Sequence, residues 1–176
     1  MRLETNRLVI RSFSADDAEE LFPILVDPEV RRFLPPSPAA TLEQFCERIA
    51  ARIAMEREHG FSLWAVQRRD TGALIGQCGL QLVERTGPDV EIAYHYGTAS
   101  WNKGYGTEAA IGVLEHGFRA LGLQQIVAFS HPDNIGSWRI MEKARMRYAG
   151  RVDVWGMTGL KKYVAEQDDW QARPLS

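Results

Sequence analysis

Apolar residues are spaced along this chain in two ways, and each spacing predicts its own kind of element. Short apolar or alternating runs are typical of strands, whereas apolar residues that recur every three or four positions are typical of helices. The order β-α-α-β-β-β-α-β-α-β-β indicates a mixed α/β sheet with helices on both faces. The predicted helices begin at Ser14 and Thr41, span about 104–121, and lie within 131–144. The predicted strands span 7–13, 61–69, 73–83, 90–96, 123–130, 146–156 and 160–167.

Residues at the ends of the helical patterns predict where the helices begin and stop. Ser14 and Thr41 each open a capping-box pattern, SADD and TLEQ, in which the hydroxyl accepts a hydrogen bond from the first turn. Pro23 lies inside the first pattern, so we expect that helix to bend or break there. Gly60 and Gly122 follow the second and third patterns, and a glycine in that place ends a helix well.

Length and composition are those of an ordinary single-domain globular protein. The chain has 176 residues, 45% hydrophobic and 25% charged, with a net charge of −2. We expect one domain over 1–176, a short helical turn and proline-rich loop at 27–38, and a flexible tail at 170–176. The charge does not favour nucleic-acid binding, and no stretch predicts a signal peptide or a membrane span. Two cysteines, Cys46 and Cys78, without metal-ligand spacing fit a metal-free protein of the cytoplasm.

The segment 100–107, SWNKGYGT, opens a helix with two glycines and raises the question of a phosphate site. Backbone N–H groups at a helix N-terminus attract anions, and glycines let the backbone approach them closely. An ordinary strand-to-helix turn is one explanation of Gly104 and Gly106. A dinucleotide fingerprint is another, but the acidic residue that should follow about 20 positions later arrives only at Asp133. A P-loop would need a Gly-Lys-Ser/Thr sequence, which is missing here.

A third explanation rests on a family resemblance. WNKGYGTEA, residues 101–109, resembles the acyl-CoA-binding motif of the GNAT superfamily of acetyltransferases, in the form typical of its RimJ/RimL-like branch of ribosomal-protein N-terminal acetyltransferases. LETNRLVIRSF near the N-terminus and DNIGSWRIMEK at 133–143 resemble two further motifs of that branch. The three motifs extend the match over most of residues 3–150. The match departs at Arg145-Met146, which stand where the branch has Gly-Phe.

The resemblance implies the GNAT fold and acetyl-CoA as the co-substrate. A metal is not expected, because the sequence has no H-E-x-x-H or similar ligand spacing. The fold would be a mostly antiparallel, seven-stranded mixed sheet that splays between its fourth and fifth strands, 90–96 and 123–130. The pyrophosphate of acetyl-CoA would lie on the backbone N–H groups of 102–107, and its pantetheine arm would run beside strand 90–96. The binding residues that the resemblance implies are Tyr94, His95, Tyr96, Trp101, Asn102, Lys103, Gly104, Tyr105, Gly106, Thr107, Asn134 and Ser137.

Acetyl transfer to an amine needs a base for the amine and a proton for the leaving thiolate. The branch commonly has a glutamate at the position of Glu91, facing the acceptor, so we expect Glu91 to be the base; an exposed and inactive strand start is the alternative. Some relatives use a tyrosine as the acid, but Met141 stands in its place. Ser137 becomes the expected donor, unless it only forms part of its helix's first turn. His131 is expected to be an exposed loop histidine.

The sequence leaves the acetyl acceptor open. In this superfamily the early helices, the loop between them and the final hairpin line the acceptor side. The branch favours a peptide N-terminal amine, while small-molecule amines and a homodimer stay open. A non-catalytic acyl-CoA-binding or sensor domain and a dinucleotide-binding oxidoreductase are the alternative functions. Candidate lining residues are Arg31, Arg32, Phe33, Trp64 and Trp155.

Overall fold

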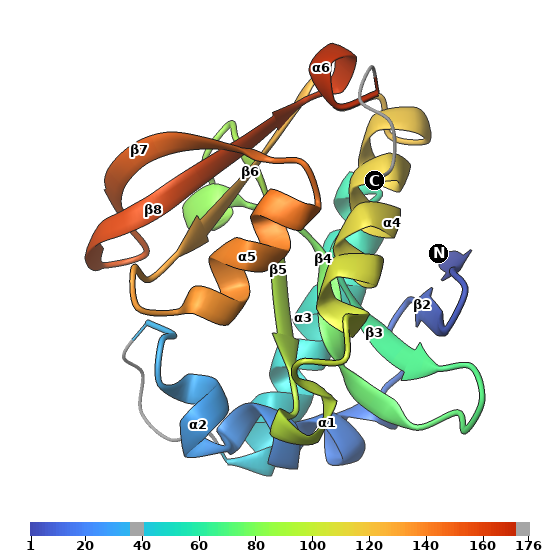
Figure 1. The fold of residues 1–176 in the computed structure, drawn as a ribbon. Helices are drawn as coiled ribbons and strands as arrows, with labels where there is room; N and C mark the ends of the chain where they lie inside the picture. Colours follow the sequence, from blue (N-terminus) through green and yellow to red (C-terminus); the bar gives the residue numbers. More distant parts are fainter. Residues whose placement is uncertain (36–40, 172–176) are drawn as a thin grey trace.

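One continuous sheet organises the molecule. The computed structural model describes residues 1–35 and 41–171, and within them eight strands lie in the order β1-β2-β3-β4-β5-β6-β8-β7 (Figure 1). All neighbouring strands are antiparallel except β5 and β6, which are parallel. The strands are β1 (Arg2–Glu4), β2 (Leu8–Arg11), β3 (Leu63–Arg68), β4 (Leu74–Leu82), β5 (Val90–Tyr96), β6 (Gln125–Ser130), β7 (Arg147–Val154) and β8 (Met157–Glu166).

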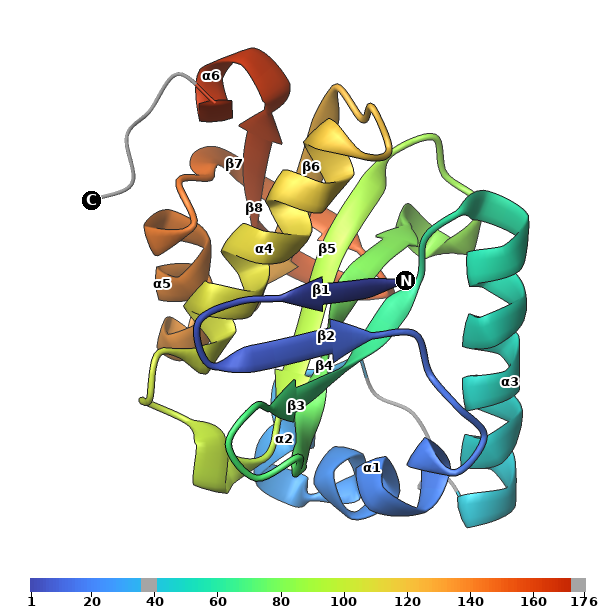
Figure 2. The same cartoon turned by 90° about the vertical axis from the view of Figure 1, so that its right-hand side faces the viewer.

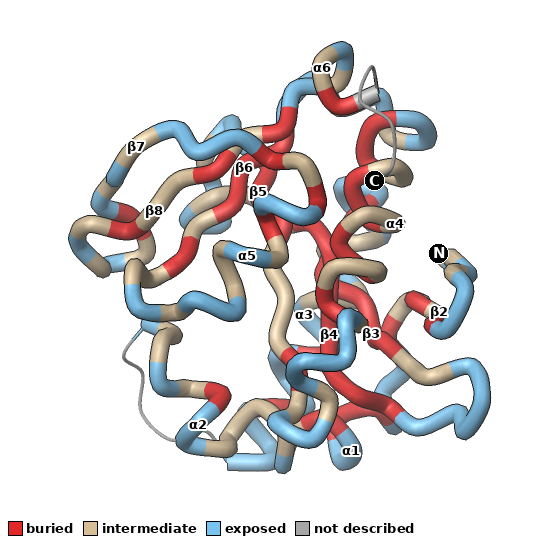
Figure 3. The backbone as a smooth tube through the Cα atoms, viewed as in Figure 1, coloured by how far each residue is buried: buried red, intermediate tan, exposed pale blue. Residues whose placement is uncertain are grey.

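Helices cover both faces of this sheet (Figure 2). α1 (Asp17–Val26) and α3 (Leu42–His59) pack on one face, and α4 (Tyr105–Arg119) and α5 (Ile135–Lys143) pack on the other. Buried residues concentrate in the central strands and on the sheet-facing side of α4 (Figure 3). Within the described ranges, no helix is long and apolar enough to cross a membrane. The short elements are α2 (Pro28–Arg31), α6 (Gln167–Gln171) and the 3-10 turns η1 (Val83–Arg85) and η2 (Thr98–Ser100).

Several boundaries that rest on local signals are confirmed. The Thr41 hydroxyl accepts from the Gln44 backbone at 3.2 Å, and the Gln44 side chain accepts from the Thr41 backbone at 3.1 Å, so α3 has the predicted capping box. Gly60 ends α3 with a φ of 78°, the left-handed conformation that glycine adopts without strain. The hairpin predicted over 61–83 is present as β3 and β4.

The first helix differs from the prediction at its start and at Pro23. α1 begins at Asp17 rather than after Ser14, and its N-cap, Asp16, makes no side-chain cap hydrogen bond. The Asp17 carboxylate still accepts from the Ser14 backbone at 2.7 Å, which is one half of the predicted capping box. Pro23 does not break α1, which continues through it to Val26. Leu21 before it and Leu25 after it pack into the same apolar cluster, so tertiary contacts hold both turns in one helix.

The ends of the chain also differ from expectation. Over residues 1–35 and 41–171 the sheet has eight strands rather than seven, because residues 2–4 pair with β2; three residues are too few for alternation to predict a strand. The predicted tail begins too early, since Trp170 lies in α6, is only 5% exposed and donates its indole N–H to the Ala144 carbonyl at 2.8 Å. Residues 172–176 of that tail, and 36–38 of the predicted proline-rich loop, lie outside the described residues.

The predicted splay of the sheet is confirmed between β5 and β6. β5 pairs with β4 along its whole length, from Val90 opposite Leu82 to Tyr96 opposite Gly76. With β6 it pairs only at Glu91, opposite Val127, and the two strands then diverge (Figure 1). Between 93 and 96 the described chain offers β5 no partner on that side. This half of β5 therefore presents backbone hydrogen-bonding groups to an open edge.

Candidate active site

The loop between β5 and α4 begins where the open edge of β5 ends. The indole N–H of Trp101 donates to the Tyr96 carbonyl at 2.7 Å and ties the loop to the end of the strand. Asn102 and Gly104 both have positive φ, 59° and 80°. Left-handed residues of this kind turn successive backbone N–H groups to one side, and such a concave loop at a helix N-terminus binds anions. Residues 102–107 therefore form an amide-rich cradle beside an unpaired strand.

The two glycines of this loop do different work. Gly104 supplies the left-handed turn just before α4. Gly106 is buried in the first turn of α4, where an added Cβ would lie 2.6 Å from Ile140 Cδ1 and 3.3 Å from a ring carbon of Tyr96. Gly106 thus lets the start of α4 pack directly on α5 and β5. The cradle is set in position by this close approach.

The N-terminal segment that resembles the family motif contacts the start of α4 and the loop before it. The Glu108 carboxylate of α4 accepts from the Thr5 hydroxyl at 2.6 Å and from the backbone and side chain of Arg7, each at 2.7 Å. The Arg7 guanidinium also donates to the Lys103 carbonyl at 2.9 Å and lies over the Tyr105 ring. Burial opposes ionisation of Glu108, but these hydrogen bonds lower its pKa overall. The contacts fix the cradle loop from outside.

Glu91 lies at the point where β5 and β6 still pair. Its side chain is 6% exposed, and its Oε2 accepts from the Trp155 indole at 2.8 Å and from the Gln81 amide at 3.2 Å. Burial raises the pKa of Glu91 to about 7, although these two hydrogen bonds act in the opposite direction. The alternative of an exposed strand start is wrong. A buried carboxyl that titrates near neutrality suits proton transfer at physiological pH.

Trp155 reaches Glu91 from a strained turn. Trp155 and Gly156 connect β7 and β8 with φ values of 57° and 69°, and the left-handed conformation is unusual for a tryptophan. The Trp155 backbone N–H donates to the Glu84 carboxylate at 3.1 Å, and Glu84 itself has a φ of 51°. Strained residues that neighbouring contacts hold in place gather at functional sites. The sequence suggests Trp155 only as one of several lining residues, because no pattern in the neighbouring residues predicts its hydrogen bond to Glu91.

Replacing Trp155 with phenylalanine should raise the pKa of Glu91. The ring stays, but the carboxylate loses a charge-assisted hydrogen bond worth about 1.5 kcal/mol or more, which corresponds to about one pH unit. With Glu91 as the base that the sequence predicts, the Glu91 limb of the pH profile of kcat/KM should therefore move from near 7 towards 8. Trp138→Phe is the matched control, because it removes an indole hydrogen bond to the Pro132 carbonyl and leaves Glu91 untouched. An unmoved midpoint in Trp155→Phe would separate this indole from the chemistry.

The residues expected beside the thioester form a small polar group at the start of α5. Asn134 is the N-cap of α5, and its side-chain oxygen accepts from the Ser137 backbone at 3.2 Å. The Tyr94 hydroxyl donates to the Ser137 carbonyl at 2.8 Å and lies 3.3 Å from the Ser137 hydroxyl. Tyr94 therefore bridges β5 and α5 below the splay, and burial raises the pKa of its hydroxyl. The ring of Tyr96 is buried on the same side of the sheet.

His95 points to the opposite face of β5, together with Glu91 and Ala93, because alternate residues of a strand share a face. Its Nδ1 lies 2.8 Å from the amide nitrogen of Gln77, its partner on β4. Burial, and next the charge of Arg52, lower the pKa of His95 to about 4, so the imidazole is neutral at physiological pH. His95 thus carries two features of the site, a backbone on the open edge and a side chain in a pocket.

One expectation about the surroundings is wrong. Trp64 cannot line an acceptor site, because it is 0% exposed in the core beneath α4 and meets His116 edge to face. His131 lies in a loop with its side chain 38% exposed, as expected, and it also stacks on Phe33 with ring centroids 5.4 Å apart. Met141, which stands where some relatives have the tyrosine acid, is buried in the core. Its thioether has no proton to donate.

Comparison with known proteins agrees with this geometry. A sequence model described as an acetyltransferase (GNAT) domain matches residues 7–147. The chain is 32% identical over 148 residues, 84% of each chain, to the uncharacterized N-acetyltransferase YoaA of Bacillus subtilis. A GNAT-family acetyltransferase from Bacillus anthracis has a similar structure, with a TM-score of 0.81, 24% identity and coverage of 96% and 99%. RimL, a ribosomal L7/L12 α-N-protein acetyltransferase whose structure was solved with coenzyme A, has a TM-score of 0.82 at 13% identity, with coverage of 96% and 99%. At these identities the two structures show a shared fold.

Proposed function

The chain belongs to the GNAT acetyltransferase family, and we propose that it transfers the acetyl group of acetyl-CoA directly to a primary amine held in the same ternary complex. The GNAT part of the sequence resemblance is thereby confirmed. The observation that carries the proposal is the open half of β5, which ends at the amide-rich loop 102–107. An extended chain with an anion at one end matches that shape.

Acetyl-CoA has this form, and each part of it has a counterpart in the site. We assign its pyrophosphate to the backbone N–H groups of residues 102–107, with the Lys103 ammonium as a nearby cation. The pantetheine amides would pair with the backbone of 94–96 as an added strand does. Asn134 and Ser137 at the start of α5 would flank the end of the arm. The support is that all these groups border the same open edge.

Glu91 and Ser137 are the proposed proton-transfer groups. The neutral amine attacks the thioester carbonyl; a C–N bond forms, the C–S bond breaks, and the amine proton passes to Glu91 through water, because Glu91 is almost fully buried. Within the described chain both hydrogen bonds to Glu91 reach Oε2, which leaves Oε1 to take the proton. The leaving thiolate is protonated from the side of Ser137. A thiol with a pKa near ~8.5 needs little help to leave as the anion.

The α-amine of a peptide is the acceptor that we favour. Neutralising an α-amine with a pKa near ~8 costs about 1.4 kcal/mol at pH 7, against roughly 4 kcal/mol for a lysine amine. A buried carboxyl with a pKa of about 7 can accept a proton from the first more readily than from the second. RimL, which shares the fold, is named for acetylating a ribosomal protein at its α-amine. We also propose that the chain belongs to the RimJ/RimL-like branch, that it acts in the cytoplasm, and that it binds neither nucleic acid nor membranes.

Calorimetric titration with acetyl-CoA, with NADPH as the control, is the first test. We expect one acetyl-CoA per chain with a dissociation constant in the range of about 1 μM to 1 mM that is usual for enzyme substrates, and no heat from NADPH. Release of CoA on addition of amines would then establish turnover. Binding without release from any amine would favour an acyl-CoA-binding domain, and binding of NADPH instead would overturn the assignment of the loop.

A further inference from the structure

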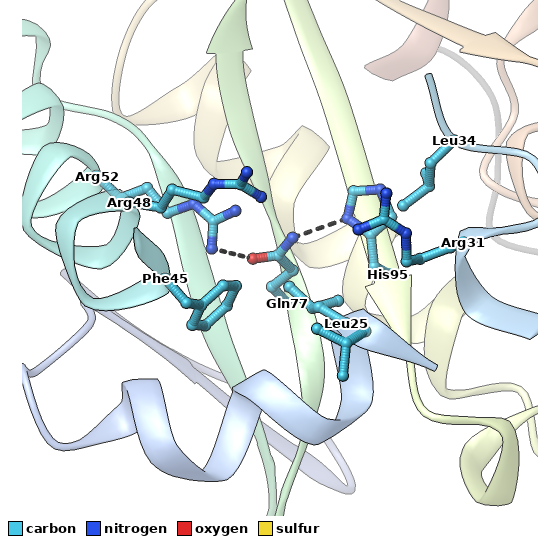
Figure 4. A pocket seen from close by; sticks show the side chains of 9 residues that line it. Leu25, Arg31, Leu34, Phe45, Arg48, Arg52, Gln77 and His95 are labelled. Atoms are coloured by element: carbon cyan, nitrogen blue, oxygen red, sulfur yellow. Dashed lines mark hydrogen bonds between the residues drawn. The ribbon is translucent and has the colours of Figure 1, made fainter. Parts of the chain in front are cut away.

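A pocket of about 120 Å³ opens on the face of the sheet opposite α4 and α5 (Figure 4). Its floor is the β4–β5 pair Gln77 and His95, and α3 forms one wall. Arg48 and Arg52 stand four residues apart on α3, so both project from the same side of that helix. We call it the arginine pocket; its polar lining residues, with the Phe45 ring beside them, are Arg31, Arg48, Arg52, Gln77 and His95.

A chain of hydrogen bonds turns the floor of the arginine pocket into a set of donors. The Arg52 guanidinium donates to the Gln77 side-chain oxygen, which orients the amide. The Gln77 nitrogen must then donate to Nδ1 of His95, at 2.8 Å. Because His95 is neutral and Nδ1 accepts, its ring proton is on Nε2. His95 therefore offers an N–H from this tautomer and has no lone pair left to act as a base.

Arg48 and Arg52 bring positive charge to the arginine pocket. Across residues 1–35 and 41–171, no carboxylate pairs with Arg48 or Arg52. Burial, and next the charges of Arg48 and Arg85, lower the pKa of Arg52 to about 10, which leaves its guanidinium cationic at neutral pH. Arg52 is partly buried, whereas Arg48 lies at the exposed rim of the pocket. A partly buried cation without a counter-charge is unfavourable. An anion in the pocket would remove that penalty.

On the basis of the proposed function, we propose that the arginine pocket binds a carboxylate of the acetyl acceptor and so selects amines that carry one. The donors converge on a space of about 120 Å³, which is roughly four water molecules and fits a carboxylate with a short stem. Guanidinium groups match the planar carboxylate with paired N–H donors. The apolar Phe45 ring suits the methylene groups of the stem.

The position of the arginine pocket relative to Glu91 limits where that carboxylate can be. His95 and Glu91 share a face of β5 and are four residues apart, about 13 Å along the strand. Ala93 lies midway, about 7 Å from each, and we place the reacting amine beside it, next to the splay. About 7 Å is the length of two extended residues. The acceptor should therefore carry its carboxylate within about two residues of the reacting amine.

Matched acceptor pairs test this selection. We would compare CoA release from peptides that differ only in Glu or Gln at the second residue, and from a free amino acid and its amide. In each pair that fits the arginine pocket, kcat/KM should be at least 10-fold higher for the carboxylate, since charged hydrogen bonds are the stronger ones. Selection only between the Glu and Gln peptides would identify an acidic side chain as the ligand of the pocket. Selection only between the free amino acid and its amide would identify the α-carboxylate of a free amino acid as the ligand. Equal rates within both pairs would overturn the proposal.

The variant Arg48→Gln tests the arginine pocket itself, with Arg57→Gln on the exposed side of the same helix as control. Arg48→Gln should raise KM for the carboxylate acceptor at least 10-fold, with a smaller change in kcat and the same acetyl-CoA affinity; Arg57→Gln should change none of these.

Titration of the CoA-bound protein with the N-acetylated Glu and Gln peptides measures product binding without turnover. Preferential binding of the Glu product without catalysis would contradict the proposed function alone. If the Glu and Gln products bound equally well, and Arg48→Gln bound them as the wild type does, the proposed role of the arginine pocket would be contradicted and the proposed function would not.

Discussion

Replacing Glu91 with glutamine is expected to slow acetyl transfer by about 10²- to 10⁴-fold, the usual contribution of a general base, and to leave the affinity for acetyl-CoA unchanged. Glutamine fits the same space, and its oxygen can accept from both Trp155 and Gln81 as Oε2 of the carboxylate does. The acetyl-CoA site proposed here is built from backbone groups of β5 and the following loop. Single-turnover rates and calorimetric titration measure the two quantities separately.

The pH dependence of the wild-type enzyme should show the titration of the same carboxyl. A base works only when it is ionised, and the pKa of Glu91 is raised to about 7 by burial. With a peptide α-amine of pKa near ~8 as the acceptor, kcat/KM should therefore rise with pH through two ionisations, that of Glu91 near pH 7 and that of the amine near pH 8. In Glu91→Gln the Glu91 limb of the profile should disappear, and the remaining activity should follow the ionisation of the amine.

The same substitution should make the protein more stable above pH 7. The folded-state pKa of Glu91, about 7, lies above its ordinary value of 4.5, so the folded state binds the proton more tightly than the unfolded state does. Stability from this group is complete below pH 4.5 and is lost as the pH rises through 7, a change of about 3 kcal/mol. Glutamine does not titrate and keeps the neutral form at every pH. Glu91→Gln should thus exceed the wild type by up to about 3 kcal/mol at pH 8.

Denaturant unfolding at pH 5 and pH 8 measures this difference. Glu58→Gln, an exposed glutamate on α3, is the control and should change neither stability nor turnover. A Glu91→Gln protein with wild-type turnover would remove Glu91 from the chemistry, whatever its stability. A slow variant whose stability advantage over the wild type does not grow between pH 5 and pH 8 would instead show that Glu91 is ionised throughout and that its pKa is not raised.

The parts of the structure that follow from local sequence were the ones that could be predicted. The capping box at Thr41, the hairpin over 61–83 and the glycine loop before α4 each depend on residues within a few positions of one another. Arg145 shows the limit of such signals. It adopts a φ of 66° at the end of α5, where the family motif has glycine, and it is held there by the Trp170 carbonyl and ring. That contact comes from a helix 25 residues away.

The surroundings of Glu91 and the arginine pocket could not be predicted, because their partners meet only in the folded chain. Trp155 is 64 residues from Glu91, and Arg52 is 25 residues from Gln77. Spacing within one segment carries no information about such pairs. The resemblance supplied Glu91 as a candidate base, but the structure supplies the reason that its pKa is raised, and only the sheet register brings Gln77 beside His95.

The substitution Gly106→Val is expected to damage both acetyl-CoA binding and stability. Even a Cβ at this position would lie 2.6 Å from Ile140 Cδ1 and 3.3 Å from the Tyr96 ring, and valine adds two further methyl groups. Overpacking of this kind typically costs about 1–3 kcal/mol. The first turn of α4 must move away from α5, and the N–H groups of 102–107 move with it. Acetyl-CoA affinity should fall at least 10-fold, because amide donors to an anion depend on their direction.

A matched glycine substitution and a compensating one make this prediction specific. Gly136→Ala lies in the first turn of α5, where an added Cβ meets only Asn134 at 4.0 Å, so it should leave affinity and unfolding unchanged or slightly improve stability. Gly106→Val combined with Ile140→Ala removes the closest contact and should recover part of both losses, as a double-mutant cycle would measure. If the second change recovered stability but not affinity, Gly106 would act on acetyl-CoA directly rather than through the position of α4. Recovery of both together would show that the packing of one glycine sets the geometry of the loop that we assign to the pyrophosphate.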